Sequence, residues 1–100
     1  MPTLNEIKIA HNRIKPFIHI TPVLTNSSLN YLAKAELYFK CENFQKAGSF
    51  KIRGATNTVL QLSDDDIKKG IATASSGNHG AALSMAVKNL GGITKVVMPN

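Results

Sequence analysis

The chain is 100 residues long and carries 12 Lys and Arg against 6 Asp and Glu, a formal net charge of +6. A chain of this length forms at most one small domain, and 43% hydrophobic with 18% charged residues is the composition of a globular protein. The basic residues are scattered from Lys8 to Lys95 and only 6% of residues are aromatic. This pattern argues against a nucleic-acid-binding surface, which needs clustered cations and aromatic stacking platforms.

The sequence also predicts a protein of the reducing cytoplasm that does not enter a membrane. Cys41 is the only cysteine, so no internal disulfide can form. The first residues are polar and charged where a signal peptide is apolar. Residues 16–33, a long stretch without Asp, Glu, Lys or Arg, contain Pro22 and many Thr, Ser and Asn residues, which do not suit a membrane span.

The first 42 residues predict two helices and a strand. Apolar residues recur at helical spacing over residues 4–14, and Pro16 ends the pattern. The chain is expected to be extended around Pro22 and helical over 26–33, where Asn and Ser supply cap residues. Apolar and polar residues alternate over 36–42, which is typical of a strand.

The remaining residues predict two helices followed by a strand, helix, strand unit. Apolar spacing favours a helix over 49–62, and Ser63 with Asp66 resembles a capping box that opens a short helix ending at Gly70. Residues 71–74 and 94–99 are expected to form strands, joined by a helix over 81–90. Parallel strands are joined in this way. Two strands would leave the faces and edges of a parallel sheet uncovered, so we expect the chain to be the opening portion of a larger α/β protein.

The stretch "GSFKIRGA" places Lys51 in the first turn of the helix expected over 49–62. With Ser49 as its cap, this turn presents free N–H groups that disfavour a positive charge. A lysine that attacks a carbonyl must be neutral and gains from such a place, whereas the alternative is a solvated lysine near a helix start. Arg53 is expected to be structural, because helical spacing can turn its guanidinium toward a nearby carboxylate.

The stretch "SSGNHG", residues 75–80, follows an expected strand and precedes an expected helix. Parallel sheets bind ligands at this edge, where the N–H groups at a helix start face an anion. The alternative is an ordinary polar turn with a helix cap. The G-x-G-x-x-G spacing of dinucleotide-binding sites does not occur here.

Two long motifs, "KCENFQKAGSFKIRGATN" (residues 40–57) and "TASSGNHGAALSMA" (residues 73–86), resemble those of the fold type II pyridoxal-phosphate enzymes, in the serine racemase and serine/threonine dehydratase branch. The resemblance extends to "HITPVLTNSSLN" before them and "VVMPN" after them. It implies an α/β fold of the tryptophan synthase β type, a parallel sheet with helices on both faces, of which this chain is the N-terminal part. Residues 1–65 would begin the large cofactor-binding domain, and residues 66–100 the small domain with its first βαβ unit.

The resemblance implies pyridoxal 5′-phosphate as the cofactor and assigns it three residues of this chain. Lys51 would be the Schiff-base lysine and the base on one face of the substrate. Phe50 would lie against the cofactor ring, and Asn78 would hydrogen-bond to the ring hydroxyl. The glycine-rich loop that binds the cofactor phosphate in this family is not found in these 100 residues.

The substrate, by the same resemblance, is a small amino acid bound by the "SSGNHG" turn. Ser75, Ser76, Asn78 and His79 would hold it, with Ser75, Asn78, His79 and the turn backbone around its carboxylate. Ser76 would stand across the cofactor from Lys51 and handle the proton on the opposite face, as in the racemase-like members; many plain threonine dehydratases carry alanine there.

The implied reaction is racemisation of L-serine to D-serine, with β-elimination to pyruvate and ammonia as a second outcome. A threonine or 3-hydroxyaspartate ammonia-lyase is the alternative enzyme, and a noncatalytic fragment that cannot hold the cofactor alone is the alternative of another class. No metal site is expected within these residues, and any Mg²⁺ of the full-length enzyme would have its ligands elsewhere. The full-length enzyme is expected to be a homodimer.

Overall fold

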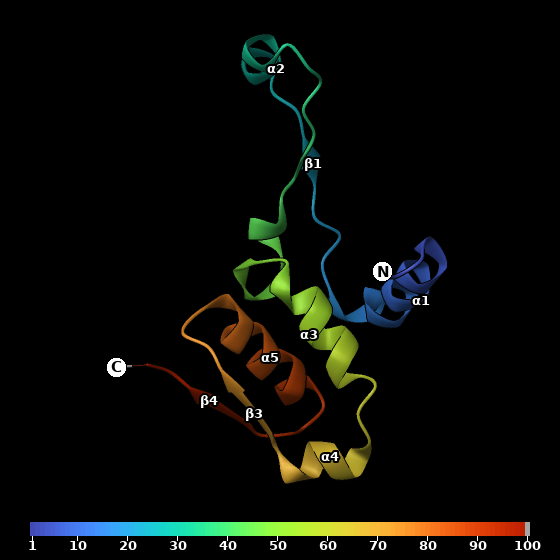
Figure 1. Ribbon diagram of the computed structural model, residues 1–100, viewed down its shortest axis with the longest axis vertical. Helices are drawn as coiled ribbons and strands as arrows, with labels where there is room; N and C mark the ends of the chain where they lie inside the picture. Colours follow the sequence, from blue (N-terminus) through green and yellow to red (C-terminus); the bar gives the residue numbers. More distant parts are fainter. Residues whose placement is uncertain (100) are drawn as a thin grey trace.

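The computed structural model describes residues 1–99 (Figure 1). Its helices are α1 (Leu4–Ile14), α2 (Ser27–Ala33), α3 (Lys51–Val59), α4 (Asp64–Lys69) and α5 (Asn78–Asn89). Its strands are β1 (Val23–Leu24), β2 (Phe39–Lys40), β3 (Ile71–Ala74) and β4 (Thr94–Val97). Short 3₁₀ turns lie at Lys15–Phe17, Glu42–Phe44 and Lys46–Gly48.

The core lies between α3 and α5, and α5 in turn covers one face of the β3–β4 pair (Figure 1). Ile52 and Val59 of α3 are 1% exposed, and Ala82 and Val87 of α5 are fully buried. The small Ala82 side chain allows α5 to lie close to its neighbours, and the buried apolar area stabilises the packing.

Strands β3 and β4 are parallel, in register from Ile71 opposite Thr94 to Ala74 opposite Val97. The predicted βαβ unit is therefore confirmed. Exposure alternates along both strands, and the side chains that do not face α5 are exposed within residues 1–99. The described helices thus cover one face of this parallel pair.

Local capping explains where α1 and α4 begin. The Thr3 hydroxyl accepts from the Glu6 N–H while the Glu6 carboxylate accepts from the Thr3 N–H, a capping box. Ser63 caps α4 by accepting from the Asp66 N–H, and Gly70, with φ of 88°, ends that helix as predicted.

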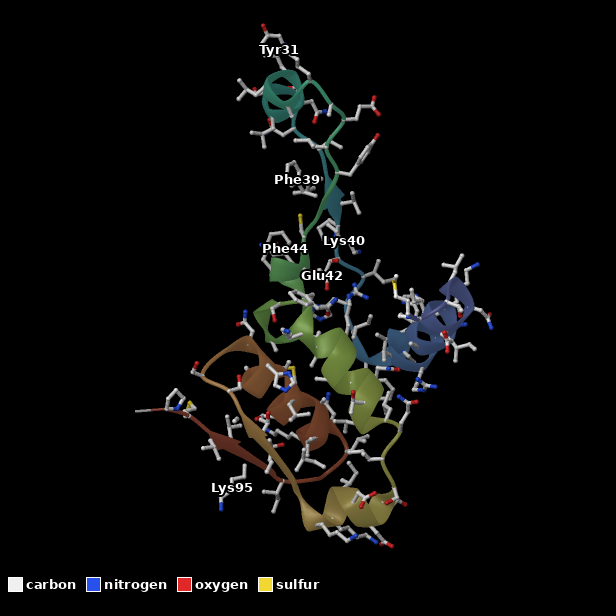
Figure 2. All side chains as sticks on the ribbon, in the orientation of Figure 1. Tyr31, Phe39, Lys40, Glu42, Phe44 and Lys95 are labelled. Carbon is white, nitrogen blue, oxygen red and sulfur yellow. The ribbon has the colours of Figure 1, made fainter. Side chains whose placement is uncertain are left out.

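Residues 20–44 form an arm that extends from the rest of the molecule, with α2 at its far end (Figures 1 and 2). Strands β1 and β2 pair antiparallel within it, Val23 opposite Lys40 and Leu24 opposite Phe39. The strand predicted over 36–42 is thus too long by five residues, because its partner β1 is itself only two residues long. Tyr31 lies near the tip of the arm and Phe39 along it, and both side chains are exposed. None of the helices described in residues 1–99 has the length and apolarity that crossing a bilayer demands.

Candidate functional site

A turn that is held by several hydrogen bonds precedes α3 and its first residue, Lys51. Ala47 and Gly48 have φ of 59° and 70°, a left-handed conformation that is strained for alanine. The buried Gln45 side chain holds this turn: its Oε1 accepts from the N–H groups of His19 (2.8 Å) and Lys46 (3.0 Å), and its Nε2 donates to the His19 carbonyl (2.8 Å). The backbone just before α3 is therefore fixed to the chain at residue 19.

Lys51 is the first residue of α3, in the first turn as predicted. Phe50 directly before it already has helical backbone angles and makes no cap hydrogen bond, whereas Ser49, the predicted cap, is extended. The buried Ser49 hydroxyl accepts from the Lys51 N–H at a long 3.4 Å. The Lys51 ammonium nitrogen lies 5.2 Å from the centre of the Phe50 ring, within cation–π range.

Arg53 makes a bidentate ion pair with Glu42, which confirms its predicted structural role. Arg53 Nε and Nη2 donate to the two Glu42 oxygens at 2.7 and 2.8 Å. The Thr21 hydroxyl donates to Glu42 Oε1 at 2.6 Å, and the Lys40 ammonium donates to the Thr21 carbonyl at 2.7 Å. The hydrogen bonds from Arg53 lower the pKa of Glu42 from 4.5 to about 2, despite an opposing effect of burial.

A cleft of about 530 Å³ lies between α3, β3 and α5. Lys51 and Phe50 line it from the start of α3, and His79 lines it from the first turn of α5. Residues 71–73 of β3 contribute another wall. The structure thus brings three of the predicted site residues together, from two segments that are 28 positions apart in the sequence.

The "SSGNHG" turn is organised by the hydroxyl of Ser75. Ser75 Oγ accepts from the N–H groups of Gly77 (3.3 Å) and Gly80 (3.0 Å), which leaves its own proton free for an acceptor. A Cβ at Gly80 would stand 3.0 Å from Val96 Cγ1, so glycine allows the close approach of α5 to β4. Helix α5 begins at Asn78, three residues earlier than predicted, so that Asn78 and His79 lie in its first turn.

Ser75 and Ser76 line a separate hollow of about 300 Å³, beside Ser84 of α5 and Val96 of β4. Ser76 is therefore not among the residues that line the cleft of Lys51. Within residues 1–99 no three His, Cys, Asp or Glu side chains are grouped so as to hold a metal ion.

Sequence reasoning missed Glu42, Thr21 and Gln45, although all three hold the segment around Lys51. One feature of the sequence could have identified Glu42 as the partner of Arg53. An arginine expected to be structural needs a carboxylate, and Glu42 is the acidic residue inside the same motif.

Known proteins are similar to this chain in both sequence and fold. The family model of pyridoxal-phosphate dependent enzymes matches residues 14–100. A serine racemase of Dictyostelium discoideum is 62% identical over 86% of this chain and 26% of its own length, and a beta-hydroxyaspartate dehydratase of Paracoccus denitrificans is 52% identical over 99% of this chain and 31% of its own. The crystal structure of serine racemase from D. discoideum superposes with a TM-score of 0.91 at 58% identity, over 97% of this chain and 32% of that one.

The chain thus spans between a quarter and a third of the length of these relatives. The superposition confirms the predicted α/β fold, in the N-terminal region of a fold type II enzyme. On the family match and these identities, the chain belongs to the pyridoxal-phosphate dependent enzyme family.

Proposed function

We propose that the protein is a pyridoxal-phosphate-dependent serine racemase with associated serine/threonine dehydratase activity. The observation that carries the proposal is the cleft in which Lys51, at the lysine position of the family motif, lies beside Phe50 and His79. The similarity to a serine racemase and to a dehydratase supports the pair of reactions, since both can start with removal of the α-proton of the amino acid.

The residues present fit the cofactor of this family. A volume of about 530 Å³ is in the range of small-molecule pockets, about 300–1,000 Å³. The cleft offers an exposed lysine amine for an aldehyde and the exposed Phe50 side chain for a flat ring. The cofactor, when bound, supplies an electron sink that makes the α-proton of the amino acid removable.

The residues of the chain would then bind the substrate and move protons. Lys51 would hold the cofactor and take or return the α-proton on one face. The exposed Ser76 hydroxyl would do so on the opposite face, and Asn78 would hydrogen-bond to the ring hydroxyl. The substrate carboxylate would lie at the "SSGNHG" turn, where Ser75 retains a proton to donate and α5 begins. His79 would contact the same carboxylate from the cleft.

A threonine or 3-hydroxyaspartate ammonia-lyase is a second candidate, favoured by the 52% identity to the beta-hydroxyaspartate dehydratase. We further infer that residues 1–65 begin a large domain and residues 66–100 a small one. Homodimer formation and a Mg²⁺ site would be properties of the full-length protein, and the cytoplasm is its proposed location.

Trapping of the cofactor tests the role of Lys51. We expect that incubation with pyridoxal phosphate, borohydride reduction and peptide mass spectrometry will place the pyridoxyl group on Lys51. Lys51→Ala should lose it, whereas Lys69→Ala, on the exposed end of α4, should keep it. A protein without any adduct would support the noncatalytic alternative, and an adduct on a different lysine would refute the assignment.

Ser76→Ala tests the proposal that Lys51 and Ser76 move the α-proton on opposite faces of the substrate. A positioned proton donor contributes about 10²–10⁴-fold to a rate. D-serine formation should therefore fall by about 10²-fold or more, while pyruvate formation, which needs only the Lys51 face for α-proton removal, should change much less. Ser84→Ala is the matched control, because Ser84 lines the same hollow as Ser76 but has no assigned role. Equal loss of both products would contradict the assignment.

A further inference from the structure

We propose that Glu42 is a positioning residue for Lys51. Through its pair with Arg53, Glu42 fixes the first turn of α3 and thereby the direction in which the Lys51 side chain enters the cleft. This inference rests on the proposed role of Lys51 as the residue that binds the cofactor.

The start of α3 has only a weak side-chain cap. The first N–H groups of a helix need partners, most often a cap side chain. Here Phe50 provides no cap bond, and the Ser49 hydroxyl reaches only the Lys51 N–H at 3.4 Å. By contrast, the nearby chain around Gln45 is held by three hydrogen bonds of 2.8–3.0 Å. The cap bond of α3 is therefore weak, and a second contact that holds its first turn would matter for the position of Lys51.

The Arg53 side chain makes that contact. Arg53 lies in the first turn of α3, two positions after Lys51. Its guanidinium meets Glu42 through two parallel hydrogen bonds of 2.7 and 2.8 Å, a geometry that fixes direction as well as distance. The pair is partly buried: the Arg53 side chain is 29% exposed and the Glu42 side chain 17%. Screening by water and salt is therefore weaker than for a surface pair.

Glu42 is itself held from a second side, so it can act as a fixed anchor. The buried Thr21 donates its hydroxyl to Glu42 Oε1 at 2.6 Å, and Lys40 holds the Thr21 carbonyl at 2.7 Å. Figure 2 shows Glu42 and Lys40 at the end of the arm that lies away from α2 and near α3. The pair thus connects α3 with two separate segments of the chain, around residues 21 and 40.

Arg53 also lines the same cleft as Lys51, so a displaced Arg53 would alter the cleft directly. A reacting group that is misplaced by about 1 Å can lose about 10²-fold in rate. Loss of Glu42 should therefore slow the reaction of Lys51 with the cofactor by more than reduced folding stability alone would.

The test compares Glu42→Gln with two further variants of the full-length protein. Glu42→Asp keeps the carboxylate and serves as the conservative rescue. Asp65→Asn is the matched control, because it removes a carboxylate from an ion pair with Lys68 whose side chains are about 80% exposed, at 83% and 79%. Two quantities are measured on each variant: amide hydrogen exchange of residues 50–60 without cofactor, and the rate at which added pyridoxal phosphate becomes trapped by borohydride on Lys51.

Glu42→Gln should speed exchange of the amides of residues 54–57, which donate to the carbonyls of the first turn, by roughly tenfold or more, the effect of losing a hydrogen bond to a charged group. Exchange in residues 58–60 should change less, and trapping on Lys51 should slow at least tenfold. Glu42→Asp should restore part of both, and Asp65→Asn should change neither.

Faster exchange without slower trapping would overturn the positioning role, since Glu42 would then only stabilise the helix. Unchanged exchange and trapping would overturn it as well. Failure of the unsubstituted protein to form any adduct on Lys51 would refute the proposed function instead, and the exchange pattern would then decide alone whether Glu42 fixes the turn.

Discussion

Glu42 is an acid whose ionisation is coupled to folding. Its pKa is lowered from 4.5 to about 2 in the folded protein, chiefly by the hydrogen bonds from Arg53. The unfolded chain therefore binds a proton at a higher pH than the folded chain does. The stabilisation from this carboxylate is complete above pH 4.5, declines as the pH falls, and is gone below about pH 2.

The pH dependence of unfolding checks this effect. We expect the loss of the carboxylate charge in Glu42→Gln to lower the unfolding free energy, relative to the unsubstituted protein, by at most about 3.5 kcal/mol at pH 7, since one pKa unit corresponds to about 1.4 kcal/mol. The difference should shrink steadily between pH 4.5 and pH 3 in urea titrations. Asp65→Asn, which removes an exposed acid, should leave this part of the profile unchanged. A difference that stays constant with pH would show that the carboxylate charge of Glu42 does not stabilise the fold.

The residues expected in the cleft could be predicted from the sequence, but the residues that hold them in place could not. Lys51, Phe50 and His79 belong to two motifs with a recognisable order, and the structure places them in one cleft. Thr21 and Gln45 contact residues 21 and 26 positions away, respectively. Such contacts depend on how the chain returns on itself, and neither periodicity nor local spacing records them.

At the scale of elements, boundaries were predictable where local chemistry decides them. Ser63 and Gly70 mark the two ends of α4 in the sequence and in the structure. The predicted start of α5 is wrong because it assigns Gly80 to the turn. In the structure, Ser75 accepts from the Gly80 N–H, and Val96 leaves little room for a Cβ at this position. Gly80 therefore allows a close contact inside the helix and does not end a turn, a distinction that depends on the strand packed beneath it.

The strand predicted over 36–42 is an element whose ends local chemistry does not decide. Its alternating pattern is real, but alternation predicts a strand only if a partner of equal length is present. Pairing with the two residues of β1 leaves β2 at Phe39–Lys40, with both side chains exposed. The pattern thus predicted the strand correctly only at Phe39–Lys40, and its predicted end at Glu42 is wrong because Glu42 begins a 3₁₀ turn.

At the scale of the whole molecule, burial is divided unequally between the body and the arm. The body, from α3 to β4, contains the cluster of buried apolar side chains around α3 and α5. The arm, residues 20–44, carries apolar side chains that are mostly exposed within residues 1–99. The body is therefore expected to supply most of the apolar stabilisation of the described residues.

A matched pair of valine substitutions tests this division. Val59 on α3 is 1% exposed, whereas Val23 in the arm is 55% exposed. Val59→Ala removes two buried methyl groups and leaves a cavity, so it should lower the unfolding free energy by about 1–3 kcal/mol. Val23→Ala should change it by less than about 0.5 kcal/mol, as is usual for exposed positions. Urea unfolding followed by circular dichroism measures both. An equal loss for the two variants would mean that the Val23 side chain is buried in the folded protein, and that the arm packs as part of the same cooperative unit as the core.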